Sequence, residues 1–101
     1  MKIPDTLKII GRDIKVVWDD TLVYQVDDTG QAQFRFDEIR LQKSNAGISR
    51  TPQSINITLL HEILHWVFFL MHEDKLNEDE PMIHRLSEVL YQVIKDNQLR
   101  F

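Results

Sequence analysis

The feature that most constrains this chain is the pentapeptide His61-Glu62-Ile63-Leu64-His65, an HExxH motif inside an apolar segment. On an α-helix, residues i and i+4 lie on one face about one turn apart, so His61 and His65 can bind one metal ion. Glu62 lies beside them, where its carboxylate can accept a proton from metal-bound water. The motif therefore predicts a zinc site with two imidazole ligands, an open coordination position and Glu62 as the catalytic base.

A second interpretation of the motif is a pair of hydrogen-bonded core histidines beside a surface glutamate. The neighbouring residues weigh against it, because Leu59, Leu60 and Val67 contribute to the apolar surface of a largely buried helix. Imidazole and carboxylate groups are costly to place in such a helix unless something satisfies them. The metal site is therefore the favoured interpretation.

The composition predicts one domain, residues 1–101, with an apolar content of 43% and a charged content of 28%. The chain has no cysteine, so zinc would have to be held by histidine and carboxylate groups. The net charge of -4 comes without a basic stripe, so we expect no nucleic-acid partner, and a metal-dependent nuclease is disfavoured. The sequence has no apolar run long enough for a membrane span and no signal-peptide core. We therefore expect no membrane partner and a cytoplasmic location.

The order of the apolar patterns predicts an α+β fold, in which a small antiparallel sheet of three or four strands precedes two helices. The expected strands are short runs rich in β-branched and aromatic residues, bounded by turn signals. They lie at residues 7–10, 14–18, 31–36 and 38–42, and residues 22–26 are a candidate for another short strand.

Turns are expected where the apolar pattern breaks. The apolar residues change parity near Asp37-Glu38, so two antiparallel strands should meet there. Asp27-Asp28-Thr29-Gly30 is a strong turn signal, and the polar segment 43–50 is expected to be a loop.

Thr51-Pro52 predicts the start of the motif helix, with the threonine as N-cap and the proline in the first helical position. This helix should run to about His72 and be followed by a charged linker, 73–79. A second helix should begin at Asp79-Glu80 and end near Asn97, because its apolar residues repeat every 3.6 positions. We expect the sheet to pack on the first helix and the second helix to cover that helix from the other side.

Two histidines hold zinc poorly alone, and a catalytic site normally has three protein ligands. His72 lies about 10 Å beyond His65 along an unbroken helix, too far for the same ion, and is interpreted as a helix-end histidine. Glu80 opens the second helix, and an antiparallel return would bring its carboxylate toward the histidine pair. His84, one turn further on, is an alternative ligand, a hydrogen-bond partner of the ligands or a donor to developing oxyanion charge, and the acidic linker also stays open. Glu80 is the favoured third ligand.

The segment Thr58-Leu59-Leu60-His61-Glu62-Ile63-Leu64-His65 resembles the signature of small phage- and prophage-type HExxH zincins, which are minimal gluzincin metallopeptidases and are more distantly similar to ImmA/IrrE-type enzymes. The segment Glu80-Pro81-Met82-Ile83-His84 resembles the part of those proteins that carries a glutamate ahead of an apolar helix. The resemblance implies a zincin-like peptidase fold with Zn²⁺ held by His61, His65 and Glu80, and with Glu62 as base. Gluzincins often carry an aspartate four residues after the third ligand, where this chain has His84.

The leading hypothesis is a zinc metallopeptidase that hydrolyses a peptide or protein substrate with a metal-activated water. An edge strand, expected at residues 38–42, would align the substrate by strand addition. The alternative is a non-enzymatic module of phage origin that uses a zincin scaffold to bind another protein. The sequence favours the enzyme, because a module that keeps zinc only for structure has no need of Glu62.

Overall fold

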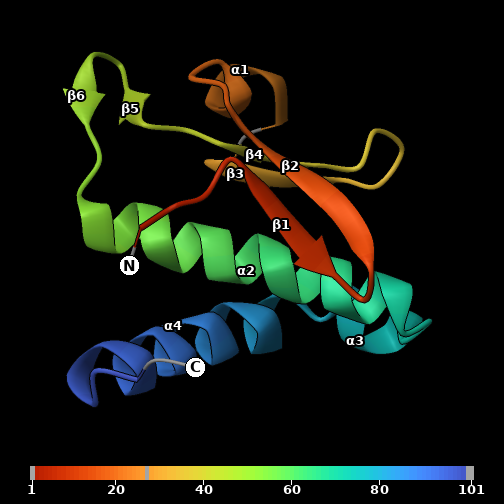
Figure 1. Cartoon of the computed structure of the whole chain (residues 1–101). Coiled ribbons are helices and arrows are strands. Elements are labelled where there is room, and N and C mark those ends of the chain that lie inside the picture. Colours follow the sequence, from red (N-terminus) through yellow and green to blue (C-terminus); the bar gives the residue numbers. More distant parts are fainter. Residues whose placement is uncertain (1, 27, 100–101) are drawn as a thin grey trace.

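The computed structural model describes residues 2–26 and 28–99, and its α+β architecture confirms the predicted fold class. Figure 1 shows three layers: a small sheet, a long helix beneath it, and a second long helix on the far side of the first. The elements in chain order are β1 (Thr6–Ile9), β2 (Arg12–Trp18), α1 (Leu22–Val26), β3 (Gly30–Gln33), β4 (Glu38–Leu41), β5 (Ser44–Asn45), β6 (Ile48–Ser49), α2 (Pro52–Leu70), α3 (Asp74–Glu78) and α4 (Glu80–Asp96).

The four-stranded sheet is mixed, whereas the sequence led us to expect an antiparallel one. Its strand order is β1-β2-β4-β3; β1 and β3 pair antiparallel with their neighbours, but β2 and β4 run parallel. The expectation that residues 38–42 form an edge strand is therefore wrong, because β4 has a hydrogen-bonded neighbour on each side. Ile39 and Leu41 in β4 are fully buried, as an interior strand requires. The edge nearest to the motif helix is β3.

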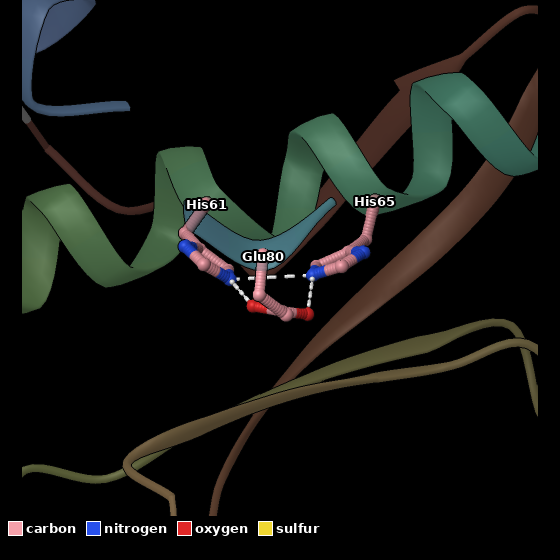
Figure 2. A group of neighbouring side chains, drawn as sticks. All are labelled: His61, His65 and Glu80. Atoms are coloured by element: carbon pink, nitrogen blue, oxygen red, sulfur yellow. Dashed lines mark hydrogen bonds and ion pairs between the residues drawn. The ribbon is translucent and has the colours of Figure 1, made fainter. Parts of the chain in front are cut away.

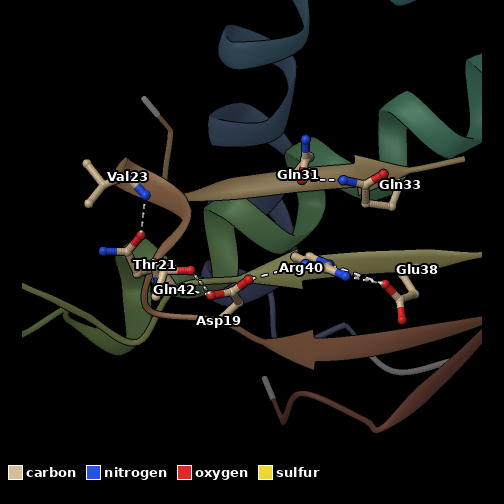
Figure 3. Close-up of polar contacts among 8 residues, drawn as sticks. All are labelled: Asp19, Thr21, Val23, Gln31, Gln33, Glu38, Arg40 and Gln42. Atoms are coloured by element: carbon tan, nitrogen blue, oxygen red, sulfur yellow. Dashed lines mark hydrogen bonds and ion pairs between the residues drawn. The ribbon is translucent and has the colours of Figure 1, made fainter. Parts of the chain in front are cut away.

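The short strand expected at 22–26 is also wrong, since this segment forms the helical turn α1. Directly before α1, Asp19 accepts a hydrogen bond from the Thr21 backbone N–H at 2.9 Å. The buried amide of Gln42 accepts from the Val23 N–H at 3.0 Å (Figure 3). It also donates to the Ser44 carbonyl at 2.7 Å, and together these bonds fix α1 against the end of β4. A five-residue apolar run is compatible with either structure, and these polar partners decide it.

The two expected turns after residue 30 differ in outcome. The antiparallel pairing of β3 with β4 is confirmed, with residues 34–37 as the connection and Asp37 in the left-handed region at a φ of 54°. The segment 43–50 is not only a loop, because β5 and β6 form a small hairpin about Ala46 and Gly47. Of the predicted turn at 27–30, Asp27 lies outside the described residues and Gly30 belongs to β3.

Both ends of α2 follow from local chemistry. The Thr51 hydroxyl accepts a hydrogen bond from the Ser54 N–H at 3.1 Å, which confirms the predicted N-cap. Helical residues end at Leu70, and His72 has a φ of 59°. The next N–H, from Glu73, donates to the Phe68 carbonyl at 2.9 Å, which completes a Schellman motif. His72 is thus a helix-end residue, as predicted, in a position that glycine normally occupies.

The chain then reverses toward the motif. The expected linker at 73–79 contains the short helix α3, and Asp79 caps α4 by accepting from the Met82 N–H at 3.2 Å. The predicted second helix is confirmed, and it ends at Asp96 with Asn97 as its C-cap. This return places Glu80, the first residue of α4, opposite the middle of α2.

The core lies between the sheet and α2. Leu59 and Trp66 on α2 pack against the buried sheet residues, and the Trp66 indole N–H donates to the Glu38 carbonyl at 3.0 Å. On the other side of α2, Ile83 and Ser87 of α4 are buried. The predicted packing of the sheet and α4 on opposite sides of α2 is confirmed, as Figure 1 shows. Through this packing, the histidine-bearing face of α2 lies between β3 and the start of α4.

Candidate metal centre

Three side chains from two helices converge on one point. His61 and His65 extend from successive turns of α2, and Glu80 faces them from the start of α4 (Figure 2). The two Nε2 atoms are 3.2 Å apart. Oε2 of Glu80 lies 3.0 Å from Nε2 of His61, and Oε1 lies 2.7 Å from Nε2 of His65. All ligand atoms of this group lie within 4.8 Å of one another, so the group could hold a metal ion.

The donor set fits a divalent metal in both kind and spacing. Two imidazoles with one carboxylate leave a fourth position for water or substrate, which is the arrangement of catalytic zinc sites. Bonds of roughly 2.0–2.1 Å in a tetrahedral site give donor–donor spacings of roughly 3.3 Å. The Nε2–Nε2 distance of 3.2 Å is close to that spacing. The histidine side chains are 14% and 13% exposed and that of Glu80 is 60% exposed, so the site opens to solvent on the Glu80 side.

The surroundings of both histidines suit metal binding. Nδ1 of His65 lies 2.6 Å from Oδ1 of Asn77 in α3, and an amide oxygen can only accept, so this contact orients the ring with Nδ1 as donor and Nε2 directed at the donor group. Burial lowers the pKa of His61 below its usual 6.5, although the nearby Glu80 carboxylate acts in the opposite direction. Both rings therefore direct Nε2 at the same point, and burial favours the neutral form of His61.

Glu62 lies beside the donor group but outside it. Its side chain is 4% exposed, and burial, with the charges of Asp28 and Glu80, raises its pKa to about 8. A hydrogen bond from the backbone N–H of Ala32 acts in the opposite direction. A buried carboxyl with a pKa near neutrality, next to a metal-binding group, has the environment of a general base.

The backbone of β3 faces this centre. The carbonyl oxygen of Thr29 accepts a hydrogen bond from the Gln42 N–H at 3.0 Å. In an antiparallel pair every second residue bonds to the partner strand, so Gln31 and Gln33 also bond to β4. Gly30 and Ala32 consequently direct their backbone N–H and C=O groups to the open edge of the sheet, in the cleft beside the donor group. The Ala32 N–H reaches Glu62 for this reason.

Two clefts meet at His61, Glu62 and Asp28. One has a volume of about 280 Å³ and extends along β3 past His65 and Glu80. The other has a volume of about 370 Å³ and extends along the N-terminal half of α2. An extended chain that crosses from one cleft to the other would pass the metal-binding group.

The structure places the other candidate ligands outside the group. His84 is exposed on α4, with its ring centroid 6.2 Å from that of His61, and its Nε2 lies 3.0 Å from a carboxylate oxygen of Glu88. It lines the larger of the two clefts beside His61. It is therefore close to the metal-binding group without being part of it. His72 lies beyond the end of α2, and none of the linker carboxylates within the described residues joins the group.

Sequence reasoning missed Asn77 and misread Gly30. Asn77 belongs to the segment that the sequence predicts as a charged linker, and its contact with His65 depends on how α3 folds back. Gly30 was assigned to a turn, yet its φ lies outside the left-handed region and it begins a strand. The only available signal for it was a glycine standing directly before an alternating strand.

Comparisons with family models, curated proteins and solved structures find no match to this chain. The resemblance to small zincins therefore stays a prediction, and the function has to be inferred from the site. Within the described residues, no helix has the length and apolar character needed to cross a membrane.

Proposed function

We propose that this protein is a zinc-dependent metallopeptidase that hydrolyses peptide bonds with Glu62 as the general base. The observation that carries the proposal is that the groups able to bind a metal and the group able to accept a proton are different residues. His61, His65 and Glu80 converge their donor atoms, while a buried fourth group, Glu62, lies beside them without joining them. A site that kept a metal only for structure would have no use for an uncoordinated buried carboxylate.

When bound, Zn²⁺ would act as a Lewis acid that lowers the pKa of a water molecule and polarises the substrate carbonyl. Glu62 accepts a proton from that water as the oxygen bonds to the carbonyl carbon. As the carbon–nitrogen bond breaks, Glu62 passes the proton to the leaving amine, so the carboxylate is regenerated. A divalent cation at the neighbouring donors would stabilise the charged carboxylate and lower its pKa from about 8, which favours the basic form at neutral pH.

We propose that β3, and not residues 38–42, aligns the substrate. As an edge strand, β3 can accept an extended peptide on its outward side, where the Gly30 and Ala32 carbonyls face the cleft. The clefts on both sides of His61 and Glu62 would hold the residues flanking the cleaved bond. Both clefts are shallow, which favours broad specificity.

The test compares wild-type protein with Glu62→Gln and with Glu78→Gln, which alters an exposed glutamate of α3. We expect Glu62→Gln to bind zinc as wild type does and to lose roughly 100- to 10,000-fold in kcat/KM on internally quenched peptides. Glu78→Gln should behave as wild type. Full activity in Glu62→Gln would reject the mechanism. Stoichiometric zinc without hydrolysis in wild type would instead favour the non-enzymatic protein-binding module.

A further inference from the structure

At Gly30 the edge strand β3 lies close against α2. It is buried, and a Cβ atom added there would overlap the methyl carbon of Thr58 and lie 3.0 Å from Oε2 of Glu62. Because the φ of Gly30 lies outside the left-handed region, a larger residue is excluded by lack of space and not by backbone conformation.

The Thr58 side chain cannot rotate away easily. Its hydroxyl accepts from Nη2 of Arg50 at 2.7 Å and donates to the Ser54 carbonyl at 3.0 Å. These two bonds fix χ1 of a β-branched side chain, which keeps the methyl group directed at β3. Arg50 also donates to the Gln42 carbonyl at 2.7 Å, so it ties the sheet to α2 at this point. A side chain at position 30 would therefore have to move the strand or Glu62.

Glu62 depends on the same close approach. The Ala32 N–H that hydrogen-bonds its carboxylate lies two residues along β3 from Gly30 and on the same side of the strand. Raising the strand from α2 would lengthen this hydrogen bond. Moving the carboxylate away from an added methyl group would displace it from the same donor.

We infer that Gly30 is a positioning residue for Glu62: by having no side chain, it lets β3 lie on α2 so that the Ala32 N–H holds the Glu62 carboxylate beside His61. This inference rests on the proposed function for the role of Glu62 as base. The position of the carboxylate relative to Ala32 can be tested separately from hydrolysis.

The experiment uses the full chain with Gly30→Ala, Thr58→Ser and the double variant. Thr58→Ser keeps the hydroxyl and removes the methyl carbon that an added Cβ would overlap. We expect Gly30→Ala to lower Tm by several degrees and the double variant to recover most of that loss. In the double variant the new methyl group still lies too close to the Glu62 carboxylate. The double variant therefore changes the position of the carboxylate without a large change in stability. Zinc content should match wild type throughout, because no ligand is changed.

The direct readout is the Ala32 amide proton in nuclear magnetic resonance spectra, with Glu62→Ala as the reference for a lost hydrogen bond. We expect the double variant to give the Ala32 shift of Glu62→Ala, and its kcat/KM to fall roughly 100-fold below that of Thr58→Ser. An Ala32 shift equal to that of Thr58→Ser would overturn the inference. If wild type hydrolyses no peptide, the proposed function fails, while the Ala32 shift still decides whether Gly30 positions Glu62.

Discussion

Folding changes the proton affinity of Glu62, because it buries the carboxyl group. In the folded metal-free protein, burial raises its pKa to about 8, against an ordinary value of 4.5. Between these values the folded state holds a proton that the unfolded state has released. Since stability falls with pH wherever the native state binds more protons, the contribution of Glu62 is full below pH 4.5 and is lost as the pH rises through about 8.

This linkage predicts a pH-dependent difference between wild type and Glu62→Gln, both freed of metal by chelation. The neutral amide does not titrate, so the free energy of unfolding of wild type should fall relative to that of Glu62→Gln as pH rises from about 5 to 8.5, by at most about 1.4 kcal/mol per pH unit. Chemical denaturation at several pH values measures it, and titration of His61 cancels in the difference. A difference that stays constant over this range would show that Glu62 is ionised throughout.

The individual site residues differ in how far the sequence could predict them. His61, Glu62 and His65 were predictable because a helix fixes their spacing whatever packs around it. Glu80 was predictable from the helix-start signals that place it at the beginning of the second helix. Asn77 was not, because its contact with His65 depends on the fold of a five-residue helix with no capping side chain.

At the scale of elements, the end of α2 decides where the chain turns back toward the metal centre. His72 holds a φ of 59° in the Schellman motif, a conformation that a side chain disfavours. We predict that His72→Gly stabilises the protein by about 1 kcal/mol, because glycine adopts this conformation without that cost. For a chain of this size the gain corresponds to roughly 4–8 °C in Tm.

His72→Ala is the matched control, since it removes the imidazole but keeps the Cβ atom. It should show no such gain in Tm by thermal denaturation. Equal stabilisation by alanine and glycine would mean that the imidazole, and not the backbone conformation, carries the cost.

The elements that were predicted correctly are those whose signals are local. Thr51 and Asp79 are the N-caps of α2 and α4, and both are residue types that favour this position in any sequence. The helical state of α1 depends on its distant partner Gln42, and β2 pairs in parallel with β4, which is not the next strand in the chain. Sequence periodicity alone could not reveal them, and the edge strand was misassigned for that reason.

At the scale of the whole molecule, three layers assemble the site from separate segments. The sheet supplies the edge strand β3, α2 supplies the histidines and Glu62, and α4 returns Glu80 to them (Figure 1). The metal group therefore forms only when the helices pack, so metal binding should stabilise the fold as a unit.

Metal content is the measurement that tests the central claim most directly. Untagged wild type, His65→Ala and Glu80→Ala would be loaded with zinc, freed of excess and measured by mass spectrometry, with His72→Ala and Glu78→Ala as matched controls. We predict near-stoichiometric zinc in wild type and both controls, and its loss in His65→Ala and Glu80→Ala. Wild type without zinc after loading, or Glu80→Ala that retains it fully, would contradict the His61, His65 and Glu80 metal centre.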